Sequence, residues 1–204
     1  MANFSRGSHS LSFNMSRIPL PTPESLDPEQ KKVYDKVVSG PRGKIQGPLR
    51  AAIYNAELAD KWQALGALLR YKTSLTPRQS ELAILITGRA CQSPFEWFAH
   101  KSEAIKAGIE PDVIEALLNQ TQPLNLSAED RLIWQFCVEL NQHNSVSDST
   151  YQAALACFGA KCIVELTALV GYYTMVAMTL NCHEIPFPDG VSGEFPLPQH
   201  LKNQ

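Results

Sequence analysis

The chain has 204 residues, of which 44% are hydrophobic and 19% are charged, a composition typical of one globular domain with a substantial core. Its 18 basic and 20 acidic residues nearly balance, and no run of basic residues occurs. This balance excludes the charge pattern expected for binding nucleic acid or an anionic membrane, and it favours a small molecule as the partner. We expect a disordered leader over residues 1–17, one domain over 18–190 and a C-terminal tail over 191–204.

The cysteines indicate a reducing compartment. They are irregularly spaced and mostly set among apolar neighbours, as buried free thiols are: Cys91, Cys137, Cys157, Cys162 and Cys182. The first fourteen residues are polar and lack the apolar segment of a secretory signal. Residues 162–182 nearly reach membrane-spanning length, but polar residues interrupt them, so they predict a buried core helix. We therefore expect a cytoplasmic protein without membrane attachment.

Capping signals divide the first half of the chain into helices. Residues 27–30 read Asp-Pro-Glu-Gln, which supplies an N-cap, a first-turn proline and a capping-box glutamine, and Gly40 supplies the stop. After a loop, residues 51–71 predict two helices or one bent helix. A second capping box at 76–79 opens a run, residues 82–86, that is apolar on every face. That run predicts a buried central helix.

The second half continues in the same way. Ser93 and Glu96 form a third capping-box pattern, which predicts a helix that Gly108 ends before a short helix from Pro111. Helical periodicity returns near residue 127 and again over 149–158. No segment alternates apolar and polar residues with the period of a strand. The sequence therefore predicts an all-α fold.

Residues 75–108 carry the most informative pattern. Arg78 and Glu81 open an apolar helix, which leads through a turn into a second helix that carries a Phe-Glu-Trp triplet and then His100. This pattern resembles the signature of the carboxymuconolactone decarboxylase / alkylhydroperoxidase D-like superfamily. A weaker likeness continues as far as residue 190. The resemblance implies an alkylhydroperoxidase D-like helical bundle, association into a homo-oligomer, and neither cofactor nor metal.

The peroxidase branch of this superfamily carries two cysteines three residues apart, the second of them four residues before the histidine. Ser93 and Glu96 stand at those positions here, so dithiol chemistry is not expected. Cys91 is the remaining candidate thiol. It is either a buried structural group or the single cysteine of a peroxidase.

His100 is the candidate general acid or base. Glu96 precedes it by four residues and so shares its helix face, where a carboxylate tunes a histidine for proton transfer near neutral pH. Glu96 could equally serve as a helix cap. Glu81 lies in an apolar helix, so its carboxylate needs a partner, for which His100, Arg78 and Arg89 are the candidates. The catalytic prediction is His100 with Glu81 and Glu96.

Arg78 or Arg89 is expected to hold a substrate carboxylate, because a guanidinium binds carboxylates bidentately. Trp97 is the candidate aromatic residue of the substrate site, although core packing is the commoner role for Trp97 and for its neighbours Phe95 and Phe98. A metal held by carboxylates around His100, Glu103 among them, is the weakest alternative, because the set contains only one histidine.

Three functions follow as expectations. The first is a cofactor-independent, carboxymuconolactone decarboxylase-like enzyme acting on a small carboxylated lactone or related organic acid. The second is an alkylhydroperoxidase-like peroxidase that uses Cys91 alone. The third is a non-catalytic helical oligomer that binds a ligand or partner, which predicts that Glu81 and His100 lie out of each other's reach.

Overall fold

The computed structural model of the chain describes residues 16–40 and 43–198. Helices, turns and irregular segments make up these residues, and no strand occurs among them, which confirms the all-α prediction. The elements in chain order are the 3₁₀ turn η1 (Pro23–Ser25), α1 (Pro28–Ser39), α2 (Leu49–Ala52), α3 (Ala56–Tyr71), α4 (Pro77–Ala90), α5 (Pro94–Lys106), α6 (Pro111–Leu118), α7 (Ala128–His143) and α8 (Asp148–His183).

Two of the three predicted capping boxes form. Asp27 accepts the backbone N–H of Gln30 at the start of α1, and Thr76 accepts that of Gln79 at the start of α4. In return, the side-chain Oε1 of each glutamine accepts the backbone N–H of its N-cap residue. The prediction of a third box was wrong: Ser93 is the N-cap of α5, but its side chain makes no cap hydrogen bond.

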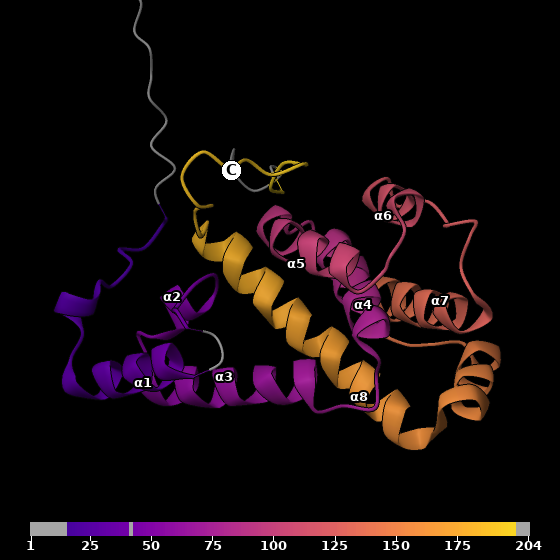
Figure 1. Cartoon of the computed structure of the whole chain (residues 1–204), viewed down its shortest axis with the longest axis horizontal. Helices are drawn as coiled ribbons and strands as arrows, with labels where there is room; N and C mark the ends of the chain where they lie inside the picture. The colour runs from indigo at the N-terminus through magenta and orange to yellow at the C-terminus, as the bar shows by residue number, and fades with distance from the viewer. Residues whose placement is uncertain (1–15, 41–42, 199–204) are drawn as a thin grey trace, which may run out of the picture.

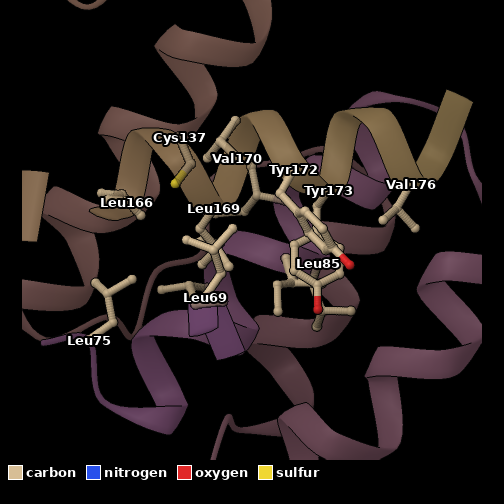
Figure 2. Close-up of a cluster of buried hydrophobic side chains, with 14 of the residues drawn as sticks. Leu69, Leu75, Leu85, Cys137, Leu166, Leu169, Val170, Tyr172, Tyr173 and Val176 are labelled. Atoms are coloured by element: carbon tan, nitrogen blue, oxygen red, sulfur yellow. The ribbon is translucent and has the colours of Figure 1, made fainter. Parts of the chain in front are cut away.

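The core forms around α4, which packs against α5, α7 and α8 (Figure 1). Residues 82–86 are buried on every face of α4, as predicted, and Leu85 is fully inaccessible. Figure 2 shows Leu85 beneath α8, with Leu69 of α3 and Leu169 of α8 beside it. Truncating such a side chain to alanine typically costs about 2–5 kcal/mol. Burial of α4 therefore fixes where its polar residues, Glu81 above all, must find partners.

The long helix α8 crosses the molecule diagonally in Figure 1. Gly159 has non-helical φ/ψ (φ 77°) and separates a first segment, close to the predicted 149–158 helix, from the apolar remainder. By length and composition α8 could span a membrane, a test that the core helix of a soluble protein also passes. Leu166, Leu169 and Tyr173 are nevertheless buried against the rest of this fold, as a core helix requires.

Both predicted terminal segments are only partly described. Residues 1–15 of the expected leader lie outside the described residues, while Ser16 and Arg17 donate hydrogen bonds to the His183 carbonyl. Residues 199–204 of the expected tail also lie outside them. The preceding residues lie against α5, where Glu194 pairs with Lys101 at 2.7 Å.

Candidate functional site: a histidine between two glutamates

The turn between α4 and α5 brings Glu81 and His100 together. Gln92 adopts the left-handed conformation (φ 49°), and Ser93 donates its N–H to the Gly88 carbonyl at 2.9 Å, so the chain reverses within a few residues. Asn181 of α8 donates to the Cys91 carbonyl at 2.9 Å and ties the same turn to the core. The two helices consequently run side by side.

Within this hairpin His100 lies between two carboxylates. Its Nδ1 is 2.7 Å from Glu81 Oε2, and its Nε2 is 3.1 Å from Glu96 Oε1. All three residues are buried, with exposed fractions of 3–7%. Gly88 lets Glu96 approach, because a Cβ at that position would lie 3.3 Å from Glu96 Cγ. The predicted meeting of Glu81, Glu96 and His100 is thus present in the structure.

This geometry requires a proton on the histidine. A neutral imidazole has one N–H and would turn a lone pair toward one of the carboxylates, whereas the imidazolium donates to both. Burial by itself would lower the pKa of His100, but Glu96 and Glu81 outweigh it and raise that pKa to about 9. His100 therefore carries its proton at neutral pH.

Arg70, at the end of α3, completes the charge pattern and was not predicted from the sequence. Its guanidinium Nη2 lies 3.7 Å from Glu81 Oε1. Charges therefore alternate along Arg70, Glu81, His100 and Glu96, so that each buried charge faces an opposite one. Tyr173 of α8 packs edge-on against the imidazole, with ring centroids 5.1 Å apart, and burial raises its pKa well above the usual value.

These groups border a pocket of about 720 Å³ among α2, α3, α5, α8 and the segment after α8. Glu96, His100, Arg70 and Arg50 line it, whereas Glu81 lies behind His100 and does not. Its apolar side is an aromatic wall of Phe95, Phe98 and Phe187, whose neighbouring ring centroids lie 5.4–6.4 Å apart. The pocket thus combines a proton-bearing end with an apolar surface.

The predicted substrate-binding residues lie elsewhere, which corrects that part of the prediction. Arg78 pairs with Asp130 at 2.8 Å and Glu110 at 2.6 Å, and so joins α4 to the elements that follow α5. Arg89 donates to the Leu118 carbonyl at 2.7 Å and borders a separate cavity of about 290 Å³. Neither arginine contacts Glu81, and neither lines the His100 pocket.

Trp97, the predicted aromatic wall, is completely buried and does not line the pocket. Its indole N–H donates to Glu194 at 3.2 Å, so core packing is its role. The wall is supplied by Phe95 and Phe98 on either side of it and by Phe187, far along the chain. Helical spacing explains the difference, because positions 95 and 98 share one face of α5 and position 97 lies on another.

Cys91, the candidate redox thiol, lacks the lowered pKa of an activated cysteine. Cys91 is half-buried, and burial raises its pKa, which a hydrogen bond with Thr174 only partly offsets. All five cysteines are free. Cys157 and Cys182 are exposed, which corrects the expectation of burial for those two. In residues 16–40 and 43–198, no cluster of three or more His, Cys, Asp or Glu side chains has the arrangement of a metal site.

Comparison with known proteins shows which family and which solved structures this chain resembles. Residues 56–134, from α3 into α7, match the carboxymuconolactone decarboxylase family. No curated protein matches the chain. Solved structures share the fold. An uncharacterized peroxidase-related protein from Ralstonia eutropha JMP134, described as an alkylhydroperoxidase AhpD core, has a TM-score of 0.71 at 16% identity, over 86% of this chain and 93% of its own.

Two further structures are similar. An uncharacterized peroxidase-related protein from Silicibacter sp. TM1040 has a TM-score of 0.70 at 16% identity and covers 85% of this chain and 92% of its own. The debrominase Bmp8, solved as a variant in complex with 2,3,4-tribromopyrrole, has a TM-score of 0.66 at 11% identity, over 84% of this chain and 90% of its own. The chain thus matches the carboxymuconolactone decarboxylase family over residues 56–134 and shares the fold of these alkylhydroperoxidase D-like structures.

Proposed function

We propose that this protein is a cofactor-independent enzyme that decarboxylates a small carboxylated lactone or a related organic acid, with His100 as the proton donor. The observation that carries the proposal is the His100 imidazole held between Glu81 and Glu96 at the edge of a pocket large enough for such a substrate. The match of residues 56–134 to the carboxymuconolactone decarboxylase family supports the same reaction class.

The chemistry needs one proton. When the bond between carbon and the carboxylate breaks, carbon dioxide leaves and the electron pair remains on carbon, where a conjugated lactone carbonyl delocalises it. A general acid must then protonate that carbon, a role that suits a histidine whose pKa lies near 9, because the group carries its proton at neutral pH. No redox step is involved, so the reaction needs no activated thiol.

The neighbouring residues take distinct parts in this proposal. Glu96 lines the pocket beside His100 and shares the proton, so it is the second group that can reach substrate. Glu81 lies behind His100 and orients the ring through Nδ1, while Arg70 neutralises the outer oxygen of Glu81. Only Glu96 and His100 would touch the reacting atoms.

The other two functions lack a favouring observation. A peroxidatic cysteine needs a lowered pKa, whereas burial raises that of Cys91. A non-catalytic role predicts that Glu81 and His100 are apart, yet they lie 2.7 Å from each other. We expect no turnover of an organic hydroperoxide with a dithiol reductant. Robust turnover that survives Cys91→Ser would contradict the redox reasoning.

The direct test is carbon dioxide release from a panel of carboxylated lactones by the parent protein and by His100→Asn. We expect the substitution to reduce turnover by about 10²–10⁴-fold, the usual contribution of a general acid, with unchanged helix content. His143→Asn, at the exposed end of α7, is the matched control and should keep full activity. Parent-like turnover by His100→Asn, or no release from any lactone by the parent protein, would contradict the proposal.

A further inference from the structure

Lys44 at the pocket rim is exposed, whereas the three other cations that line the His100 pocket are buried or partly buried and differ in how they are paired. Arg70 is held by Glu81, and His100 is held by Glu81 and Glu96. Arg50 differs from both: across residues 16–40 and 43–198, no carboxylate lies within ion-pair distance of it, and its side chain makes no hydrogen bond. Glu103, the other pocket carboxylate, is paired with Lys106 at 2.7 Å.

An unpaired guanidinium in this position is costly. Arg50 is only partly exposed, and burial lowers its pKa without any compensating partner. The ordinary pKa of an arginine is so high that Arg50 remains charged. Loss of a proton therefore cannot relieve the free-energy cost of desolvating its guanidinium. A buried polar or charged group normally has a partner in the protein or in its ligand. Here the open side of Arg50 faces the pocket.

The backbone of Arg50 is well anchored. It lies on the short helix α2, whose other residues, Leu49, Ala51 and Ala52, are all buried in the core. Its N–H donates to the carbonyl of Gly47, which has φ 56° and lies against the Phe95 ring. The backbone that carries the Arg50 side chain is thereby fixed at the edge of the pocket, near the Phe95 ring, before any ligand arrives.

We propose that Arg50 binds a carboxylate of the substrate, while Phe95, Phe98 and Phe187 cover the adjoining apolar part of the molecule. A guanidinium fits a carboxylate bidentately, and no other pocket arginine is free to do so. The ligand class is thus a carboxylate with an apolar body, and Arg50 takes the role that the sequence suggested for Arg78 or Arg89. The proposal rests on the proposed function insofar as the ligand is the substrate of the His100 site.

The reaction also decides which carboxylate Arg50 holds. A carboxylate that leaves as carbon dioxide loses its charge in the transition state, so binding it tightly would favour the starting state and slow the reaction. Arg50 therefore holds a carboxylate that the reaction retains. The substrate therefore carries a second carboxylate, which is the one that departs.

The experiment uses the full chain and two probes, phenylacetate and the uncharged phenylacetamide, with binding measured by calorimetry. The parent protein should bind phenylacetate more tightly than the amide. Arg50→Gln should weaken phenylacetate binding by about 10- to 100-fold and leave amide binding unchanged, since a charge-assisted bidentate pair contributes about that factor. Arg50→Lys keeps the positive charge but loses the two parallel N–H donors of the guanidinium, so an intermediate affinity for phenylacetate is expected.

Arg89→Gln is the matched control, because Arg89 likewise has no acidic partner within ion-pair distance in the part of the chain that the structure describes, but it borders the separate 290 Å³ cavity. It should bind both probes as the parent does. The proposal is overturned if Arg50→Gln and Arg50→Lys both bind phenylacetate like the parent, if Arg89→Gln loses binding instead, or if the parent does not prefer the carboxylate. Binding that depends on Arg50 without any lactone turnover would contradict only the proposed function. Turnover that depends on His100 but not on Arg50 would contradict only this inference.

Discussion

Replacing Glu81 by glutamine tests the charge arrangement around His100 most directly. The substitution keeps the shape and an acceptor oxygen 2.7 Å from Nδ1 but removes the negative charge. A neighbouring opposite charge usually shifts a pKa by about 1–3 pH units, so the pKa of His100 should fall from about 9 toward neutrality. Arg70 also loses its carboxylate. We expect Glu81→Gln to lower the free energy of unfolding at pH 7 by about 3 kcal/mol.

The pH dependence gives the sharper signature. Because the folded pKa of His100 is raised from 6.5 to about 9, its stabilisation, about 3 kcal/mol, is complete below pH 6.5 and is lost as the pH rises through about 9. Urea unfolding at pH 6.5 and pH 9.5 should therefore show a large decline for the parent protein and a clearly smaller one for Glu81→Gln.

Other groups titrate in this range, so the comparison needs a control variant. Glu194→Gln removes a partly exposed carboxylate that pairs with Lys101 and does not contact His100. Its stability should decline with pH as steeply as that of the parent. A Glu81→Gln protein that also declines as steeply would refute the reasoning, because Glu81 would then not hold the proton on His100.

Three more predictions concern stability and assembly. Ser93→Ala should leave the free energy of unfolding unchanged or raise it by up to about 1 kcal/mol, because the buried Ser93 hydroxyl has no hydrogen-bond partner in the described residues. Ser127→Ala should instead lower the free energy of unfolding by about 1 kcal/mol, because it removes the side chain that caps α7. Parallel urea unfolding of the two variants checks this. Arg78→Gln should lower the free energy of unfolding by about 3 kcal/mol, since Asp130 would be left buried and unpaired. Calorimetric titration of this variant with phenylacetate should still give the parent affinity. Exposed leucines on α3 (Leu58, Leu65 and Leu68) and the exposed Val164 and Met178 of α8 support the prediction of a homo-oligomer. Sedimentation showing only monomer at micromolar concentration would contradict it.

Features that depend on nearby residues could be predicted. The start of α4 at Thr76 and the end of α1 at Gly40 follow from capping interactions that span three or four positions. The burial of α4 follows in the same way, because residues 82–86 are apolar all round the helix. The pairing of Glu96 with His100 also belongs here, since the two are four residues apart on one helix.

The failure at Ser93 shows where local rules stop. The Ser93 and Glu96 pattern matches that of Thr76 and Gln79, yet only the latter forms a reciprocal box. The Glu96 carboxylate has a stronger partner in the His100 imidazolium at 3.1 Å, and Gly88 leaves room for it there. Whether the cap or the ion pair forms depends on the neighbouring helix, which the capping pattern does not contain.

The sequence by itself determined the helices, their order, the superfamily resemblance and the residues of the proton-bearing cluster, because capping, periodicity and the spacing of the signature are properties of neighbouring positions. Only the tertiary structure decided which charges meet. Arg70 reaches Glu81 from α3, Arg50 faces the pocket from α2, and Phe187 arrives from the segment beyond α8. Arg78 and Arg89 are drawn to other partners. A charge in a protein interior is stabilised by whichever opposite charge or carbonyl the packing of distant helices brings within about 4 Å, so its partner is a property of the fold and not of its neighbours in the chain.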